Sequence, residues 1–274
     1  MEGTSALMMQ WVGAGTSPVD WCEANYTVTP HIAEFVNTFS NILFLIVPAA
    51  CSTLWSSYAR QVSRGIHVVW IFFTVIGLSS AYFHATLSLL GQLLDELSIL
   101  WVLMVSYTLF TPIQYRPSFL RDNPREYSAI ITVLAVLITA SAFVQPAINA
   151  YALFLVGGPA ITMLVPDNIK YNSHNYAHLS KGTVIFLDSQ ALGWTGTGFS
   201  CPWGTGKPFP DVLGVWDYGI MTPTSWYYDH DVLFCYFHAI QDVPESKPSL
   251  RYWPYEKWGL PYVYCKSDKQ NKTP

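Results

Sequence analysis

Long stretches without a charged residue restrict most strongly how this chain can fold. No Asp, Glu, Lys or Arg occurs from Phe35 to Ala59, from Gly65 to Leu94 or from Tyr127 to Pro166. A helix needs about 20 mostly apolar residues to cross the hydrocarbon core of a bilayer, and each window can supply one. The last window is broken by "VQPAIN" and so predicts two helices. A third apolar stretch directly follows Glu96. The sequence therefore predicts an all-α, polytopic transmembrane helical bundle, with the apolar centre of the first span at 41–50 and further spans at 66–87, 97–110, 127–144 and 150–165.

The composition agrees with a membrane protein. Of the 274 residues, 51% are hydrophobic and only 12% are charged, which leaves few charges for an ordinary soluble surface. The formal net charge of −4 argues against a nucleic-acid partner. The five cysteines show no CxxC spacing, which excludes a disulfide framework and a zinc–thiolate cluster. The partner expected from composition is the lipid bilayer.

The positions of the basic residues predict an orientation in the membrane. No Lys or Arg precedes Arg60; Arg60 and Arg64 lie in the first connection, and Arg116, Arg121 and Arg125 lie in the third. Cytoplasmic loops carry the excess of Lys and Arg, so we expect a lumenal or extracellular N-terminus and a cytosolic C-terminus. The first 34 residues lack the features of a signal peptide, so the first span is expected to act as the insertion signal.

A serine and a histidine in the second span, and a carboxylate pair just before the third, stand out in "SSAYFHATLSLLGQLLDEL". Ser80 and His84 are four residues apart and share one helix face, and the predicted "SLLG" turn brings Asp95 and Glu96 across a hairpin from them. Two interpretations stay open. The carboxylates favour the positive end of a helix dipole and His84 is a bonded core histidine, or the group is functional, as intramembrane ionisable residues usually are. A histidine suits a metal, a carboxylate can move protons, and a serine hydroxyl can stabilise an oxyanion.

A second group of polar residues precedes the first span in "DWCEANYTVTPHIAEF". Asp20, Glu23, Asn25 and Glu34 offer hard oxygen donors, and the backbone carbonyl of Trp21 adds another, as calcium prefers. The spacing is not that of an EF-hand loop, and acidic loop residues often only cap a helix or contact solvent. "NYT" also matches a glycosylation site, which is incompatible with a metal on Asn25.

Several long motifs resemble the alkaline ceramidases, which are seven-span zinc amidohydrolases of intracellular membranes. They are "VDWCEANYTV", "AEFVNTFSN", "AYFHATLSLLGQLLDELSILWVL" and "QPAINAYAL", and the tail "RYWPYEKWGLPYV" resembles the C-terminal ending of the family. The resemblance covers residues 17–160 and 232–264. It implies hydrolysis of the N-acyl bond of ceramide to a sphingoid base and a free fatty acid, in the membrane of the endoplasmic reticulum or the Golgi.

The resemblance also implies roles for individual residues. His84 would be one ligand of Zn²⁺, while Asp95 and Ser80 would flank the attacking water and the substrate amide. The implied ligands of Ca²⁺ are Asp20, Trp21 (through its carbonyl), Glu23, Asn25 and Glu34.

The segment 166–231 departs from the family pattern. The family completes its zinc site with a His-x-x-x-His pair, which should fall near Trp216 and Ile220, where this chain reads "VWDYGIM". The only His-x-x-x-His in the sequence is "HNYAH", with His174 and His178, and it lies inside a hydrophilic stretch. His230 and His238 are no better candidates for the missing zinc ligands. An altered splice form or a faulty gene model is one hypothesis for this segment. Sequencing the transcript across 160–235 tests it.

Two classes of function therefore stay open. The chain is expected to be a membrane ceramidase or a catalytically incomplete homologue with a lipid-binding or receptor-like role. The expected organisation is a lumenal loop at 1–34, a transmembrane bundle at 35–165, an irregular segment at 166–231 and a cytosolic tail at 232–274.

Overall fold

The computed structural model is mostly helical and divides into two compact units. The first comprises Met1–Leu43, Gly77–Asp95 and Asn168–His230; the second comprises Phe44–Ile76, Glu96–Asp167 and Asp231–Pro274. The structure describes residues 9–20, 23–149, 151–153, 155–157, 221–255 and 258–266.

The described residues include four stretches of helix that are long and apolar enough to cross a membrane. The first, Phe35–Leu54, consists of α2 (Phe35–Ser40) and α3 (Leu43–Leu54), and the short α4 (Ser56–Gln61) follows it. The others are α5 (Ile66–Thr86), α6 (Leu89–Phe110) and α7 (Pro124–Val144). The fifth predicted span is described only at its start, where 147–149, 151–153 and 155–157 are helical.

Large apolar side chains on these helices lie exposed on the protein surface. On α7, Val133, Val136, Leu137 and Val144 are all exposed, and Val144 is 84% exposed. Soluble proteins rarely present contiguous apolar surface of this kind. An apolar face on a helix of spanning length is what contact with lipid chains requires.

The connection between α5 and α6 is tighter than the sequence predicted. We expected the third span to begin at 97 after an "SLLG" turn, but α6 begins at Leu89. The turn consists of Leu87, which has a φ of 48°, and Ser88, whose hydroxyl accepts a hydrogen bond from the Gly91 N–H at 3.1 Å. This serine cap lets the helix begin before the polar residues are reached. Asp95 therefore lies inside α6 and not ahead of it.

The C-terminal third contains more regular structure than expected. Helix α11 (Met221–Asp242) includes residues 221–231, which were predicted to be irregular. The expected tail forms a short 3-10 turn (Pro244–Ser246) and then a hairpin of β1 (Pro248–Tyr255) and β2 (Trp258–Cys265). The strands are antiparallel, from Pro248 opposite Cys265 to Tyr255 opposite Trp258. The aromatic and β-branched residues of this stretch suit a strand, so a small sheet accompanies the helices.

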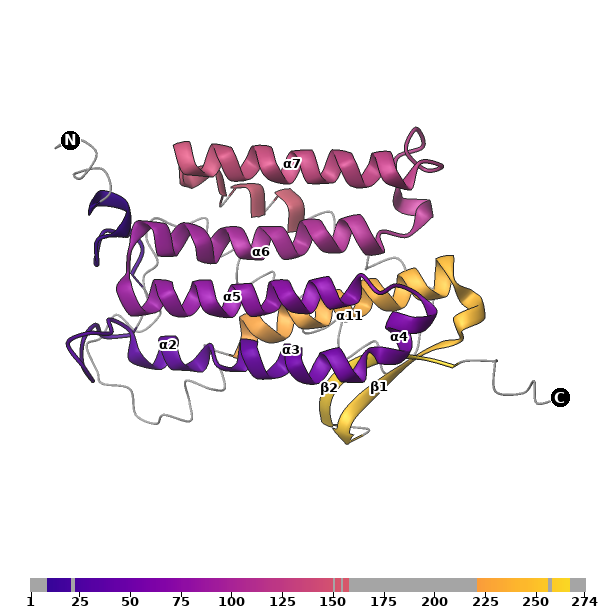
Figure 1. The fold of residues 1–274 in the computed structure, drawn as a ribbon, viewed down its shortest axis with the longest axis horizontal. Helices are drawn as coiled ribbons and strands as arrows, with labels where there is room; N and C mark the ends of the chain where they lie inside the picture. Colours follow the sequence, from indigo (N-terminus) through magenta and orange to yellow (C-terminus); the bar gives the residue numbers. More distant parts are fainter. Residues whose placement is uncertain are drawn as a thin grey trace. The chain divides into compact units, whose positions relative to one another are not determined.

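Aromatic side chains form the core of the second unit. Trp55 stacks edge-on against Tyr58 and Trp70, with ring centroids 5.4 and 5.5 Å apart, and Phe110 packs on Tyr58 at 6.2 Å. Ser106 and Asp231 form a buried polar pair in this unit, in which the Ser106 hydroxyl donates to the Asp231 carboxylate at 2.6 Å. Figure 1 shows α6 and α7 side by side in this unit, with the hairpin at the end where α4 lies.

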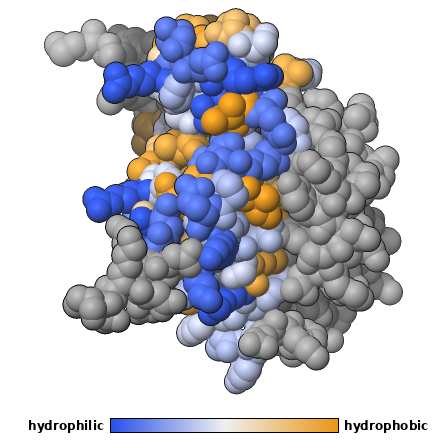
Figure 2. All heavy atoms as spheres, turned by 90° about the vertical axis from the view of Figure 1, so that its right-hand side faces the viewer, coloured by the Kyte–Doolittle hydropathy of each residue, from blue (hydrophilic) through white to orange (hydrophobic). Residues whose placement is uncertain are grey.

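That end of the second unit is strongly hydrophilic, as Figure 2 shows. It includes the connections α4–α5 and α6–α7, the end of α11 and the hairpin. Its described basic residues outnumber the acidic ones by eight to four (Arg60, Arg64, Arg116, Arg121, Arg125, Lys247, Arg251 and Lys266 against Asp122, Glu126, Asp242 and Glu245).

Candidate functional site

The C-terminal end of α5 is closed by the segment that precedes the first span. The last carbonyls of a helix have no partner within it. Here they accept from distant N–H groups: Gly15 donates to Thr86 at 3.0 Å, Ser17 to Leu87 at 2.9 Å, Ala33 to Ala85 at 3.0 Å and Glu34 to His84 at 3.0 Å. The contact is also apolar, since Val19 and buried Ala33 pack against Phe83 and Leu87. The N-terminal loop is thereby fixed directly on His84.

His84 and Glu34 form a buried pair at the centre of this contact. The Glu34 carboxylate is fully buried and contacts His84 Nδ1 through Oε2, and the His84 side chain is 12% exposed. An ionised carboxylate can only accept, so a hydrogen bond from His84 to ionised Glu34 is donated by the Nδ1–H group. Histidines that bind metals usually donate their second ring N–H to a carboxylate, which fixes the ring. This geometry fits His84 as a metal ligand, and a metal would then bind through Nε2.

Glu23 and Asn37 extend this polar group. The Glu23 carboxylate accepts from the N–H groups of Val36 at 2.7 Å and Asn37 at 2.8 Å, and so caps the first turn of α2. The side chain of Asn37 donates to Glu34 Oε2 at 3.3 Å. Asn37 thus joins two of the predicted calcium ligands. The alternative that the acidic residues of the loop cap a helix therefore holds for Glu23. This does not exclude a metal, because a carboxylate oxygen that accepts one hydrogen bond can still bind a cation.

Asp20 and Asn25 form the remaining part of the predicted calcium group. Asn25 Nδ2 donates to both oxygens of the Asp20 carboxylate, at 3.1 and 3.0 Å. Asn25 Oδ1 is buried and accepts no hydrogen bond. A buried acceptor without a donor is costly, and a hard cation would satisfy it. This amide oxygen fits a Ca²⁺ ligand. Trp21, whose carbonyl was the fifth predicted ligand, lies outside the described residues.

The two predicted catalytic residues lie on neighbouring helices of the first unit. Ser80 is buried, at 9% exposure, one helical turn before His84 on α5. Asp95 is half-buried on α6, and it has an interaction partner in the structure. Glu96, the next residue, accepts from Asn149 Nδ2 at 3.0 Å, which gives it a structural role. The participation of Ser80 and Asp95 in chemistry stays a prediction.

The pairing of His84 with Glu34 was missed by the sequence reasoning. Glu34 was assigned only to the calcium group, and its partner is 50 residues away along the chain. Spacing could not reveal this contact. A usable signal was that Glu34 directly precedes an apolar span, where a buried carboxylate needs a partner.

A complete metal centre is not visible in the part of the chain that the structure describes. Within it, no three His, Cys, Asp or Glu side chains are grouped so as to hold a metal ion. His238, in the second unit, has Nδ1 3.3 Å from the Tyr58 hydroxyl and Nε2 3.7 Å from Asp242. Of the residues that were expected to bind Zn²⁺, His84 lies in the described part of the chain. The other positions considered for the zinc pair, His174, His178, Trp216 and Ile220, lie outside the described residues.

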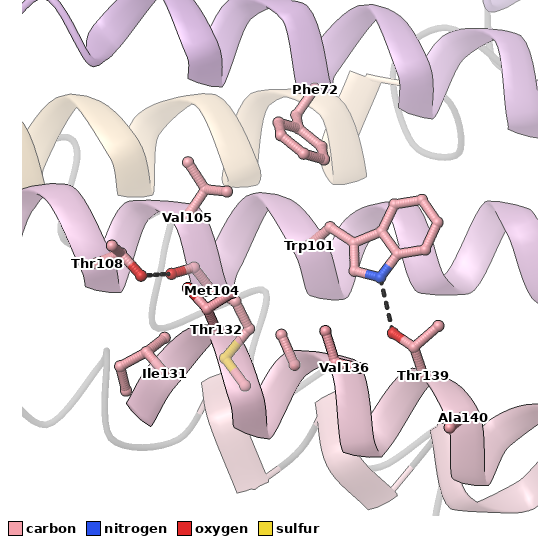
Figure 3. Close-up of a pocket in the computed structure, with 11 residues that line it drawn as sticks. Phe72, Trp101, Met104, Val105, Thr108, Ile131, Thr132, Val136, Thr139 and Ala140 are labelled. Carbon is pink, nitrogen blue, oxygen red and sulfur yellow. Dashed lines mark hydrogen bonds between the residues drawn. The ribbon is translucent and has the colours of Figure 1, made fainter. Parts of the chain in front are cut away.

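A cavity of about 460 Å³ lies in the second unit among α5, α6 and α7. Its lining is apolar apart from three threonines and Trp101, whose indole N–H donates to the Thr139 hydroxyl at 2.9 Å (Figure 3). Thr108 also bonds internally, to the Met104 carbonyl at 2.9 Å. None of the described residues that line this cavity is titratable, and their mostly apolar side chains suit an apolar occupant.

Comparison with known proteins gives consistent matches over most of the chain. A family model described as Ceramidase matches residues 13–264. The chain is 37% identical over 260 residues to "Alkaline ceramidase" of Drosophila melanogaster, covering 94% of this chain and 91% of that protein. It is 34% identical over 258 residues to "Alkaline ceramidase 1" of Homo sapiens, covering 93% and 97%. The mouse protein of the same name is 33% identical over 281 residues, with 99% of both chains covered.

The matched range runs through 166–231, the segment that the sequence analysis found divergent. The match extends from the N-terminal loop across the buried Glu34–His84 pair to the hairpin. The chain therefore belongs to the ceramidase family.

Proposed function

We propose that this protein is a membrane amidohydrolase that cleaves the N-acyl bond of ceramide. Water adds to the amide carbonyl, the C–N bond breaks, and the nitrogen takes a proton, so the products are a free fatty acid and a sphingoid base. Membership of the family and the names of its relatives support this substrate. The observation that carries the proposal within the chain is the buried Glu34–His84 pair between apolar helix α5 and the N-terminal loop.

Three side chains of the first unit are assigned to the reaction. His84, held by Glu34, would bind Zn²⁺. When bound, this ion would act as a Lewis acid that polarises the oxygen atoms taking part in the reaction. Asp95 would take a proton from the attacking water and return it to the leaving nitrogen. Ser80, one turn from His84, would donate a hydrogen bond to the oxyanion.

We also propose a calcium site in the N-terminal loop, with Asp20, Glu23, Asn25 and Glu34 as ligands together with the carbonyl of Trp21. The buried amide oxygen of Asn25 beside the Asp20 carboxylate supports it. The ion would compensate several acidic groups and hold the loop on the end of α5. The ion would also help to hold His84 in place, because Glu34 is both a proposed calcium ligand and the partner of His84.

The proposed location is the membrane of the endoplasmic reticulum or the Golgi, with the N-terminus in the lumen and the C-terminus in the cytosol. The basic excess at the hydrophilic end of the second unit supports this orientation, because cytoplasmic ends are rich in Lys and Arg. Protease protection of tags on the two termini in sealed microsomes tests it. A lumenal C-terminal tag would overturn the orientation.

Hydrolysis is tested with the purified full chain in nanodiscs that contain ceramide. We expect release of fatty acid, and a loss of at least about 100-fold in His84→Gln, as expected for a residue that binds the metal. The matched control is His31→Gln, because His31 belongs to the same unit but is exposed. It should hydrolyse ceramide at the normal rate. Monodisperse, folded wild-type protein without turnover would refute the proposed reaction.

Metal content separates the enzyme from the catalytically incomplete homologue. The enzyme should copurify with about one Zn²⁺ per chain, and His84→Gln should lose it while remaining folded. A folded wild-type chain with neither zinc nor turnover would establish the lipid-binding or receptor-like alternative.

A further inference from the structure

The hairpin of β1 and β2 presents an aromatic face that the proposed reaction does not use. Arg251, Trp253 and Tyr255 alternate along β1 and are all exposed, with Trp253 at 49% and Tyr255 at 70%. Directly paired residues lie on the same face of a sheet. The register places Tyr262 opposite Arg251 and Leu260 opposite Trp253 on this face. We call the face formed by Arg251, Trp253, Tyr255, Leu260, Tyr262 and Tyr264 the aromatic face.

The opposite face of the hairpin is fixed to the second unit. Val263 and Cys265 alternate with the residues of the aromatic face and are buried. The Cys265 N–H donates to the Ser57 hydroxyl of α4 at 3.2 Å, and the Lys266 N–H donates to the Ser246 carbonyl at 3.0 Å. The base of the hairpin is therefore held in place, and the aromatic face points away from its support.

The position of this base defines the level of the hairpin relative to the bilayer. Ser57 belongs to α4, which begins at Ser56, two residues after the end of the membrane-length stretch Phe35–Leu54. A helix rises about 1.5 Å per residue, so Ser57 lies only a few ångströms beyond the end of that stretch. The hairpin thus starts at the boundary between hydrocarbon and headgroups.

Two physical limits then select one layer for the aromatic face. Among the described residues the sheet has two strands, so each strand has an outer edge that the other strand does not pair, and open sheet edges are excluded from hydrocarbon. Exposed Trp and Tyr side chains close together are unfavourable in bulk water. The headgroup layer accepts both, because it is hydrated and it is where Trp and Tyr concentrate in membrane proteins.

Arg251 matches the charge of that layer. Its guanidinium carbon lies over the Tyr264 ring, 3.8 Å from the ring centre, so the cation is held against the aromatic face. Guanidinium groups bind phosphate well. A cation beside exposed tryptophan and tyrosine is the combination that a phospholipid headgroup accepts.

We propose that the aromatic face of the β1–β2 hairpin is an interfacial anchor that contacts the phospholipid headgroups of the membrane that the chain spans. It would fix the height and tilt of the second unit through Trp253 and Tyr255. The occupant of this surface is the bilayer itself, and not a second protein.

The test places a reporter on Trp253 in the intact chain. Full-length protein labelled with 5-fluorotryptophan is reconstituted in phosphatidylcholine nanodiscs, and the ¹⁹F resonance of Trp253 is assigned from its absence in Trp253→Phe. Phosphatidylcholine with a nitroxide on its headgroup is then added. We expect the Trp253 resonance to broaden at least about twofold. If the nitroxide lipid leaves the Trp253 resonance unchanged, the proposal is overturned. That result is also expected if another protein or a second copy of the chain covers the face.

A matched control asks whether any residue at this end would respond in the same way. Asp122 is exposed in the α6–α7 connection of the same unit, at the same hydrophilic end. Asp122→Trp adds one assignable resonance there, and we expect the nitroxide lipid to broaden it less than the Trp253 resonance. Equal broadening at both positions would mean that the hairpin has no special contact with the membrane, and the proposal would fail.

Discussion

The buried contact of Glu34 with His84 allows a graded prediction. Both the His84 ring and the Asn37 amide contact the same carboxylate oxygen, Oε2. The carbonyl oxygen of a glutamine can take that place and accept from both donors. Glu34→Gln therefore keeps these two contacts and removes the charge, whereas Glu34→Ala removes the acceptor altogether.

The magnitudes follow from this difference. A hydrogen bond to a charged group contributes about 1.5–3 kcal/mol and a neutral one about 0.5–1.5 kcal/mol, so Glu34→Gln should lower the free energy of unfolding by about 1–3 kcal/mol. Removing one partner of a buried charged pair costs about 3–5 kcal/mol, which is our expectation for Glu34→Ala. With about 2–4 °C per kcal/mol for a chain of this size, the glutamine variant should melt about 2–12 °C below the wild type, and the alanine variant lower still.

The assay is thermal unfolding of each variant in the same detergent, with zinc content measured in parallel. Glu126→Gln is the matched control, because Glu126 is exposed in the first turn of α7. It should change neither quantity. A double-mutant cycle with His84→Ala should give a coupling energy of about 1–3 kcal/mol between the two residues, as expected for groups in direct contact.

Two results would refute the reasoning. If Glu34→Gln and Glu34→Ala melt at the same temperature, the shared acceptor oxygen is not what stabilises the contact. If the double-mutant cycle gives no coupling energy, the two side chains act independently, and the carboxylate does not orient His84.

Three further predictions concern other parts of the chain. A Cβ on Gly91 would lie 2.9 Å from the Phe83 Cα, so Gly91→Ala should cost about 1–3 kcal/mol, more than the roughly 1 kcal/mol gained in helix propensity; an unchanged melting temperature would contradict it. Calcium at about 100 times its Kd should stabilise the wild type by about 2.7 kcal/mol, and Asn25→Ala should abolish the shift in melting temperature. Burial raises the pKa of the Cys265 thiol, so maleimide should modify it more slowly at pH 8 than an exposed thiol and faster as the pH rises, which mass spectrometry measures.

The sign of the Cys265 shift also gives a stability prediction. A thiol whose pKa is raised by folding favours the protonated form, so its contribution is complete below the ordinary thiol pKa and declines as the pH rises above it. Cys265→Ala should therefore flatten the loss of stability between pH 8 and 10. The cysteine is buried, at 2% exposure, so an identical pH dependence in both proteins would show that the thiol does not ionise on unfolding.

The sequence predicted the membrane helices well because their signal is local. Charge-free windows of spanning length contain their own evidence of structure, and α5 and α7 lie within a few residues of the expected ranges. The predicted helix boundary was wrong where a hydrogen bond from a side chain determines where the helix begins. The Ser88 hydroxyl caps α6 and starts it at Leu89, eight residues before the expected span. The hairpin was missed because its aromatic residues were read as a motif and not as alternating strand positions.

The sequence could predict which residues belong to the candidate site but not which of them contact one another. The types of Asp20, Asn25 and His84 suggested their chemistry, and spacing placed Ser80 on the same helix face as His84. The bond between Glu34 and His84 depends on a loop that meets a helix 50 residues later, and no periodicity encodes such a meeting.

The four backbone donors that close the end of α5 have a consequence for biogenesis. Gly15, Ser17, Ala33 and Glu34 leave the ribosome before the carbonyls that they bond, which belong to residues 84–87. During synthesis the loop must remain without these partners until the chain has been made as far as residue 87. We therefore expect nascent chains arrested before α5 to keep an N-terminal loop that proteases cut readily, and chains arrested after α6 to resist cleavage there.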